Sequence, residues 1–223
     1  MTSIKPINFG ILTIPYQTTD VAGPIDILSN VSQAFIADLE KIGAAAPGAS
    51  KNGIPITFHH IGETLDAVSL TGAFKVLPTT TCDDCPPLDC LLVGGADPNS
   101  YQLGERFTTF VQQHVAARKL LFMTCTGALC ISSSGILDGK NATTNHMCIE
   151  LAKMARPTVK WTKEAQWVVD GNLWSSGGAC AGMDMMAYWV KKTYGEDVVQ
   201  YAYETLDFEP RDVHGKRVLA AEK

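Results

Sequence analysis

The amino-acid sequence predicts an α/β protein with a mostly parallel central sheet and helices on both faces. Two observations predict this fold. Short continuous apolar runs, such as those at 88–93 and 120–123, are typical of strands that are buried on both faces. These runs alternate with helical segments, as in layered α/β domains. At 223 residues, with 46% hydrophobic and 18% charged residues, the chain fits one globular domain spanning 1–223.

The N-terminal half begins with a buried strand at 8–15, followed by a loop at 18–24 that opens a helix over about 25–42. Near-alternating apolar residues predict a second strand at 54–61. The other expected elements of this half are a loop at 44–53, a short hairpin at 69–78 around Gly72, a polar loop at 79–87, a strand at 88–93 that ends in Gly94-Gly95-Ala96, and a helix at 101–117.

The C-terminal half contains the strand at 120–123, a sharp corner and a helix of small residues. Asp170-Gly171-Asn172 is a turn signal, across which 173–175 can pair back on a strand at 166–169. The remaining expected elements are a short helix near 147–154, a strand at 159–161, a helix from Gly177-Gly178 to about 192, and a last helix near 196–203.

Composition excludes several classes of function. The net charge of −5 gives no reason to expect binding to nucleic acid or to an anionic membrane. No apolar run is long enough to span a bilayer, and the N-terminus lacks a secretory signal, so we expect a cytoplasmic protein. The seven cysteines are an odd number, which favours free thiols over a disulfide framework.

The most informative stretch is the corner Thr124-Cys125-Thr126-Gly127. A cysteine between a buried strand and a helix is held out on a tight turn, which is the geometry that exposes a nucleophile. The free N–H groups of the following helix point at the sulfur, so we expect them to favour the thiolate over the thiol. The alternative is a buried structural cysteine, and the local pattern alone does not separate the two.

The predicted architecture brings other candidates to the same place. Ligands of parallel sheets bind outside the carboxyl ends of the strands. Asp20 follows the first strand, Gly94 and Gly95 follow a central strand, and Cys125 follows the next. This convergence favours a functional Cys125. For Asp20, capping of the following helix is the competing interpretation, and for the two glycines it is a plain tight turn.

These residues lie in segments that resemble the DJ-1/PfpI (ThiJ) superfamily, which is related to class I glutamine amidotransferases. The matching segments are Thr19-Asp-Val-Ala-Gly-Pro24, Leu91-Leu-Val-Gly-Gly95, Thr124-Cys-Thr-Gly-Ala128, Gly135-Ile-Leu-Asp-Gly-Lys-Asn-Ala-Thr-Thr-Asn-His146 and Ser176-Gly-Gly-Ala-Cys-Ala-Gly-Met-Asp184. The isonitrile hydratase-like branch is the most similar. The resemblance implies a flavodoxin-like three-layer sandwich, a homodimer, and a nucleophilic cysteine at the corner.

Two departures from the family patterns narrow the expected chemistry. The PfpI-type peptidases place a histidine directly after the cysteine, where this chain has Thr126, so the peptidase arrangement is absent. The family acid near the cysteine is often Glu, whereas here it is Asp20, as in the isonitrile hydratase-like branch. That branch also resembles domains of some AraC-type regulators. The chain stops shortly after the core, so no AraC-type DNA-binding domain is expected.

The resemblance and the chemistry assign roles to these residues. Cys125 is the expected nucleophile and Asp20 the expected general acid–base group, because a carboxylate beside a thiol raises the pKa of at least one of them. Gly95 and Thr126 are candidate backbone N–H donors to a developing anion, with Gly94 beside them. His146 is a candidate base, although a structural histidine fits as well.

Cys82-Asp-Asp-Cys85 has the spacing of half a zinc site or of a redox pair. No second pair of ligands follows at the usual interval, so we expect no metal and interpret the two cysteines as a fortuitous surface pair. An oxidisable pair is the lesser alternative.

Three functions are consistent with these residues. The leading one is cofactor-free hydration of a small electrophile by Cys125, most concretely of an isonitrile to an N-substituted formamide. The second is a glyoxalase III-like conversion of methylglyoxal to lactate, which calls for a histidine such as His146. The third is a redox-sensing or chaperone-like protein in which Cys125 is oxidised to a sulfinate.

Overall fold

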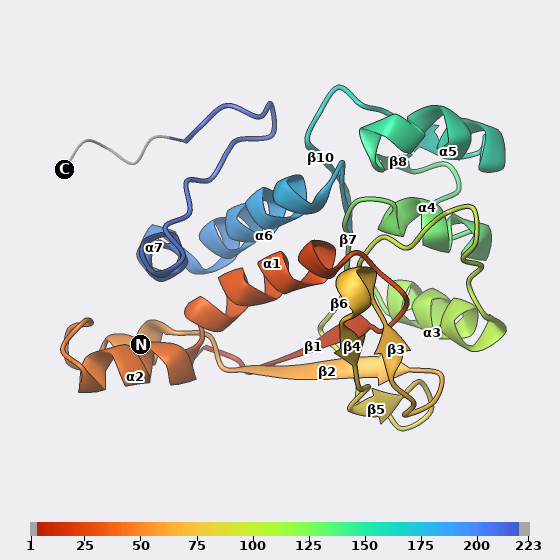
Figure 1. Cartoon of the computed structure of the whole chain (residues 1–223). Coiled ribbons are helices and arrows are strands. Elements are labelled where there is room, and N and C mark those ends of the chain that lie inside the picture. The colour runs from red at the N-terminus through yellow and green to blue at the C-terminus, as the bar shows by residue number, and fades with distance from the viewer. Residues whose placement is uncertain (1–3, 219–223) are drawn as a thin grey trace.

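The computed structural model describes residues 4–218 and confirms the predicted flavodoxin-like three-layer α/β fold (Figure 1). A sheet of seven strands forms the middle layer, in the order β10-β11-β7-β6-β1-β2-β5. Every neighbouring pair is parallel except the hairpin of β10 and β11. The strands are β1 (Ile7–Leu12), β2 (Ile56–Gly62), β5 (Thr80–Thr81), β6 (Cys90–Val93), β7 (Leu120–Met123), β10 (Trp167–Asp170) and β11 (Leu173–Ser176).

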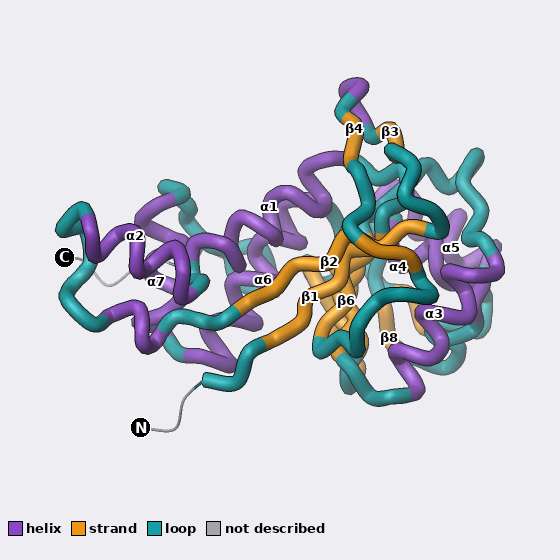
Figure 2. The backbone as a smooth tube through the Cα atoms, turned by 90° about the horizontal axis from the view of Figure 1, so that it is seen from below, coloured by secondary structure: helices purple, strands orange, loops and turns teal. Residues whose placement is uncertain are grey.

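Helices cover both faces of this sheet. Figure 2 shows α1, α2, α6 and α7 on one side and α3, α4 and α5 on the other. Helix α1 packs against α6 and α7. The helices are α1 (Thr18–Asn30), α2 (Gln33–Lys41), α3 (Glu105–Ala116), α4 (Gly127–Ile131), α5 (Ile149–Ala155), α6 (Ala179–Tyr194) and α7 (Glu196–Thr205). No helix among residues 4–218 is long and apolar enough to cross a bilayer.

Two small sheets complete the fold. Strands β3 (Val68–Ser69) and β4 (Lys75–Val76) form the expected hairpin around Gly72, which has a left-handed φ of 69°. Figure 2 shows that this hairpin projects from the body of the molecule. Strands β8 (Asn141–Ala142) and β9 (Lys160–Trp161) pair in parallel beside α5.

The prediction of one helix over 25–42 was wrong, because the helix begins earlier and the segment forms two helices. Helix α1 begins at Thr18, ends at Asn30, and contains Pro24 in its interior. Proline lacks the N–H that would bond to the carbonyl of Asp20, four residues earlier. The Thr124 hydroxyl donates to that carbonyl instead, at 2.9 Å. A contact distant in sequence therefore compensates the helix for its proline.

Smaller differences also follow from local chemistry. The second helix begins separately because the Ser32 hydroxyl caps it and accepts from the N–H of Phe35 at 3.2 Å. The segment 79–87, expected to be all loop, contains the short edge strand β5. The helix expected after Cys125 is present but has only the five residues of α4.

Aromatic side chains in the core position the functional end of the sheet. Phe122 on β7 is fully buried, and its ring lies 6.2 Å from that of Phe9, 5.7 Å from Trp174 and 5.3 Å from Trp189. Burying a phenylalanine contributes about 2–3 kcal/mol. This packing fixes β7, and with it the direction in which the chain reaches Cys125.

Candidate functional site

The carboxyl ends of β1, β6 and β7 lie side by side, so the residues that follow these strands meet as the architecture predicts. The backbone N–H of Gly95 donates to Asp20 Oδ2 at 2.9 Å. A Cβ atom added to Gly95 would lie 2.3 Å from Thr126 Oγ1, which is too close for any larger residue. Asp20, Gly95 and Thr126 are therefore packed in direct contact around the start of α4.

Cys125 has the backbone geometry of a nucleophile elbow. Its φ is +55°, in the left-handed region that costs a side-chain-bearing residue on the order of 1–2 kcal/mol. Two donors hold its carbonyl oxygen: the N–H of Asn145 and the hydroxyl of Thr144, each at 3.0 Å. The strained turn is thus fixed by the segment that follows β8.

The surroundings of Cys125 favour the thiol. The residue is only 8% exposed. Burial raises the pKa of the Cys125 thiol, and the negative charge of Asp20 raises it further. The Asn145 amide and the Thr126 N–H lower this pKa but do not offset the increase. This rise in the pKa of Cys125 runs against the expectation that the corner favours the thiolate, because burial and the charge of Asp20 outweigh the donors at the sulfur.

Asp20 is the ionisable partner of Cys125. Its side chain is fully buried, and burial raises the pKa of the carboxyl to about 6, against the smaller lowering by the Gly95 N–H and the Cys125 thiol. Oδ1 is buried and hydrogen-bonds to no residue in the described part of the chain. The N-cap of α1 is Gln17, so Asp20 does not cap the helix. Its carboxylate instead reaches across to the neighbouring strand ends.

The other predicted site residues are already engaged. The N–H of Gly95 is donated to Asp20, and the hydroxyl of Thr126 is donated to the carbonyl of Ala96 at 2.7 Å. A Cβ atom on Gly94 would lie 2.7 Å from Val21 Cγ2, so close packing requires glycine there too. The Thr126 N–H is the predicted donor that acts on the sulfur, since it lowers the pKa of Cys125.

Asn145 belongs to the site and was missed by sequence reasoning. Its Nδ2 donates to Cys125 Sγ at 3.2 Å, and its Oδ1 accepts from the N–H of Met147 at 3.0 Å. The second bond caps the short 3-10 turn at 146–148 and thereby fixes the orientation of the amide. An asparagine directly before a helical turn was the signal in the sequence that could have identified it.

His146 packs beside the site without bonding to its sulfur. A Cβ atom on Gly177 would lie 2.5 Å from His146 Nε2. This nitrogen is buried and hydrogen-bonds to no residue within 4–218. The His146 ring therefore contacts the turn after β11. His146 directly follows Asn145, whose amide reaches Cys125.

Comparison with known proteins identifies the family. Residues 21–192 match the DJ-1/PfpI family. The chain belongs to this family. The match begins within α1, one residue after Asp20, and includes the corner at Cys125 and the segment that carries Asn145.

Relatives in the DJ-1/PfpI family include enzymes and regulators. The chain is 28% identical to isonitrile hydratase from Pseudomonas putida over 207 residues, which cover 92% of this chain and 79% of that protein. It is 26% identical to the HTH-type transcriptional regulator GbdR from Pseudomonas aeruginosa over 124 residues, or 56% of this chain and 34% of the regulator.

Solved structures agree on the fold. A THiJ/PfpI family protein from Pseudomonas syringae superposes with a TM-score of 0.73 at 19% identity, over 94% of this chain and 78% of that one. Drosophila melanogaster DJ-1beta superposes with a TM-score of 0.69 at 15% identity, over 91% of this chain and 98% of that one.

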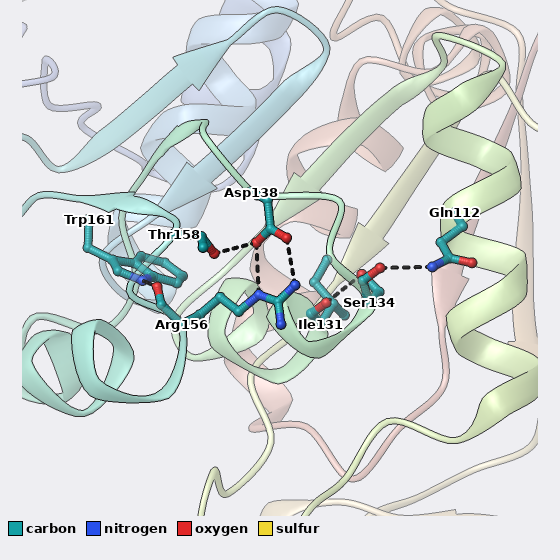
Figure 3. Close-up of polar contacts among 7 residues, drawn as sticks. All are labelled: Gln112, Ile131, Ser134, Asp138, Arg156, Thr158 and Trp161. Carbon is teal, nitrogen blue, oxygen red and sulfur yellow. Dashed lines mark hydrogen bonds and ion pairs between the residues drawn. The ribbon is translucent and has the colours of Figure 1, made fainter.

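A cavity of about 440 Å³ is lined by Tyr101, Leu129, Cys130 and Arg156, and neither Cys125 nor Asp20 is among its lining residues. The wall after α4 is firmly tied, as Figure 3 shows. Arg156 pairs with Asp138 through two contacts of 2.8 and 2.6 Å, and the Thr158 hydroxyl also donates to Asp138. These contacts tie the segment around Asp138 to the end of α5.

The Cys82–Cys85 pair lies away from these residues, after β5. Both side chains are half-buried, and burial raises the pKa of each thiol to about 11. The described residues include no group of three or more His, Cys, Asp or Glu side chains that could hold a metal ion.

Proposed function

We propose that this protein is a cysteine-dependent enzyme that adds water to a small electrophile, most concretely an isonitrile, to give an N-substituted formamide. The observation that carries this proposal is the buried Cys125–Asp20 pair, in which the pKa of the carboxyl is raised to about 6 while the thiol is kept protonated. At neutral pH the pair therefore holds one base and one proton. The likeness to isonitrile hydratase supports the choice of substrate.

The reaction follows from moving that proton. The Asp20 carboxylate accepts the thiol proton as Cys125 Sγ attacks the terminal carbon of R–N≡C. Asp20 then delivers the proton to the same carbon, which leaves the thioimidate R–N=CH–S–Cys125. Water adds across the C=N bond, and departure of the thiol gives R–NH–CHO. The sum is R–N≡C plus water, and both side chains return to their starting states.

The surrounding donors assist the sulfur. The Asn145 amide lies 3.2 Å from Sγ and stabilises negative charge on it when the proton leaves. The Thr126 N–H acts in the same direction. Both donors are fixed by backbone structure, so they need little reorganisation during the reaction.

A turnover assay with cyclohexyl isocyanide tests the proposal. The wild type should form N-cyclohexylformamide, and Cys125→Ala should form none. Cys180→Ala is the matched control, because Cys180 is an exposed cysteine on α6, and it should keep wild-type activity. Formamide production that survives in Cys125→Ala contradicts the proposed nucleophile.

Conversion of methylglyoxal to lactate is the second candidate. It is supported by His146 Nε2, a buried nitrogen without a hydrogen-bond partner in the described range, one residue from Asn145. Under this alternative, methylglyoxal turnover is lost in both Cys125→Ala and His146→Ala. Isonitrile hydration by the first mechanism does not use His146 and should persist in His146→Ala.

The proposal also includes a cytoplasmic homodimer, as the family resemblance implies. Three large apolar side chains on or beside the β3–β4 hairpin support self-association: Leu65, Phe74 and Leu77 are 58%, 64% and 67% exposed. Sedimentation equilibrium of the wild type and of Phe74→Glu tests the proposed homodimer. A wild type that sediments as a monomer contradicts it.

A further inference from the structure

A second cavity, of about 500 Å³, lies between α6, β10 and the C-terminal segment 210–218. Figure 1 shows this segment turning back over α6 after α7. Apolar and aromatic side chains supply much of its lining, notably Trp167, Val169, Tyr188, Tyr203 and Val213. Neither Cys125 nor Asp20 lines it. Its volume and lining are those of sites for small organic molecules.

A buried ion pair builds this cavity. The side chain of Asp184 on α6 is 0% exposed. Its Oδ1 accepts from the backbone N–H of Arg211 at 2.9 Å, and its Oδ2 accepts from Arg211 Nε at 2.9 Å and contacts Nη2 at 2.8 Å. These charge-assisted bonds tie the C-terminal segment to α6. The ion pair between Asp184 and Arg211 therefore fixes this wall of the cavity.

Three cationic side chains line this cavity against two carboxylates: Lys191, Lys192 and Arg211 against Asp184 and Asp212. The backbone N–H, Nε and Nη2 of Arg211 all contact Asp184, whereas Nη1 makes no hydrogen bond to the described residues. Lys192 lies 6.0 Å from the ring centroid of Tyr188 and forms no ion pair within the described part of the chain. Lys191, by contrast, is paired with Glu196. Arg211 Nη1 and the Lys192 ammonium thus remain available for a ligand, even though Asp184 holds the rest of the Arg211 guanidinium and the Asp212 carboxylate also lines the cavity.

Exposed apolar side chains gather at the same place. Val169 and Tyr188 are each 43% exposed and Val218 is 40% exposed, and all three line the cavity. Leaving large apolar groups in water is unfavourable, and an exposed apolar patch next to fixed charges is typical of a binding surface. The cationic side chains favour a ligand with an anionic group, and the aromatic side chains favour a ligand with an apolar body.

We propose that this cavity binds a small organic anion, a carboxylate or sulfonate with an aromatic or aliphatic body, independently of the chemistry at Cys125. The anionic group bonds to Arg211 Nη1 and lies close to Lys192. The apolar body packs against Tyr188, Trp167 and Val169. The site is separate from the proposed hydration reaction and does not depend on it.

Three probes with one apolar body test the charge selection: 4-phenylbutyrate, 4-phenylbutanol and 4-phenylbutylamine, each titrated by calorimetry into the full chain. We expect 4-phenylbutyrate to bind with a Kd of about 1 mM or tighter. The amine should bind at least about tenfold more weakly, with the alcohol between them. Equal affinity for all three, or no saturation by the carboxylate up to about 10 mM, overturns the proposal.

Two variants place the bound carboxylate. Lys192→Glu reverses a charge at the cavity and should weaken 4-phenylbutyrate binding about tenfold. Lys75→Glu makes the same change on the exposed β3–β4 hairpin and should have no effect. Cys125→Ala should also bind normally. Binding that is lost in Cys125→Ala but kept in Lys192→Glu assigns the probe to the Cys125 site and contradicts the proposed cavity.

Discussion

Two carboxyl groups of this protein are buried almost equally but have different partners. Asp20 is 0% exposed and Asp184 is 1% exposed, and each accepts a hydrogen bond from a backbone N–H. Asp184 also faces the guanidinium of Arg211. Asp20 faces no cation among the described residues; its ionisable neighbour is the Cys125 thiol.

This difference separates a structural acid from a chemical one. Burial raises the pKa of Asp184 as well, but its bonds to Arg211 oppose this rise, and removal of the carboxylate leaves the cation uncompensated. A buried carboxyl beside a thiol has no such compensation, so its charge is costly and its proton is easily moved. We therefore expect Asp20 to matter for turnover and Asp184 to matter for stability.

Asp20→Asn should give the largest effect. Asparagine keeps an acceptor for the Gly95 N–H but cannot take the thiol proton. Because general acid–base catalysis contributes about 10²–10⁴-fold, kcat for cyclohexyl isocyanide should fall about 10³-fold. The variant should remain folded, as measured by circular dichroism. Activity within a few-fold of the wild type would remove Asp20 from the mechanism.

The stability of the wild type should carry the signature of Asp20 in its pH dependence. The folded pKa of about 6 lies above the unfolded value near 3.9, so the folded state binds more protons between these values. The contribution of Asp20 therefore becomes less favourable by about 2–3 kcal/mol as the pH rises from about 4 to about 6. Urea unfolding should show Asp20→Asn gaining stability relative to the wild type across this window. A constant difference between the two proteins argues against the raised pKa.

Asp184→Asn should lower the stability of the protein and leave its turnover nearly unchanged. The change leaves Arg211 without its carboxylate, but the Arg211 side chain is 37% exposed, so the loss should be about 2 kcal/mol, below the range for fully buried pairs. Turnover per folded molecule should stay within about twofold of the wild type. Asp138→Asn, which breaks the more exposed pair with Arg156 in Figure 3, is the control and should cost less stability. Equal losses in the two variants contradict the structural role of Asp184.

Asn145→Ala should give the smallest of these effects, and it tests the part of the site around Cys125. Loss of the amide donor should raise the pKa of the Cys125 thiol further and lower kcat about tenfold. Asn172→Ala is the matched control, because Asn172 donates its amide to the Lys119 carbonyl instead. The pH at which iodoacetamide alkylates Cys125 should rise only in Asn145→Ala. If both variants behave like the wild type, the amide has no role in holding the sulfur.

The layered fold was predictable because it rests on local hydrophobic patterns. Continuous apolar runs at 88–93 and 120–123 became β6 and β7, and the turn at Asp170-Gly171-Asn172 became the β10–β11 hairpin. The start of α1 was not predictable in this way. Pro24 indicates a break, and only the distant hydroxyl of Thr124 shows why the helix tolerates it.

The positions of the site residues were also predictable, but their electrostatics were not. The strand-end rule brings Asp20 and Cys125 together from the sequence alone. The protonation of the thiol depends on how completely water is excluded and on the charge of Asp20, which only the folded structure defines. Asn145 was missed because its contact with Cys125 joins segments that are distant in the chain.

The most direct test of this account is the pH dependence of Cys125 alkylation by iodoacetamide in the wild type and in Asp20→Asn, followed by intact mass. In the wild type, the rate should reach half its maximum at a pH above the ordinary thiol value near 8.5. In Asp20→Asn, the midpoint should move to lower pH, because the neighbouring negative charge is gone. A wild-type Cys125 that is fully reactive at pH 7, or a midpoint that Asp20→Asn leaves unchanged, contradicts the coupling of the two groups.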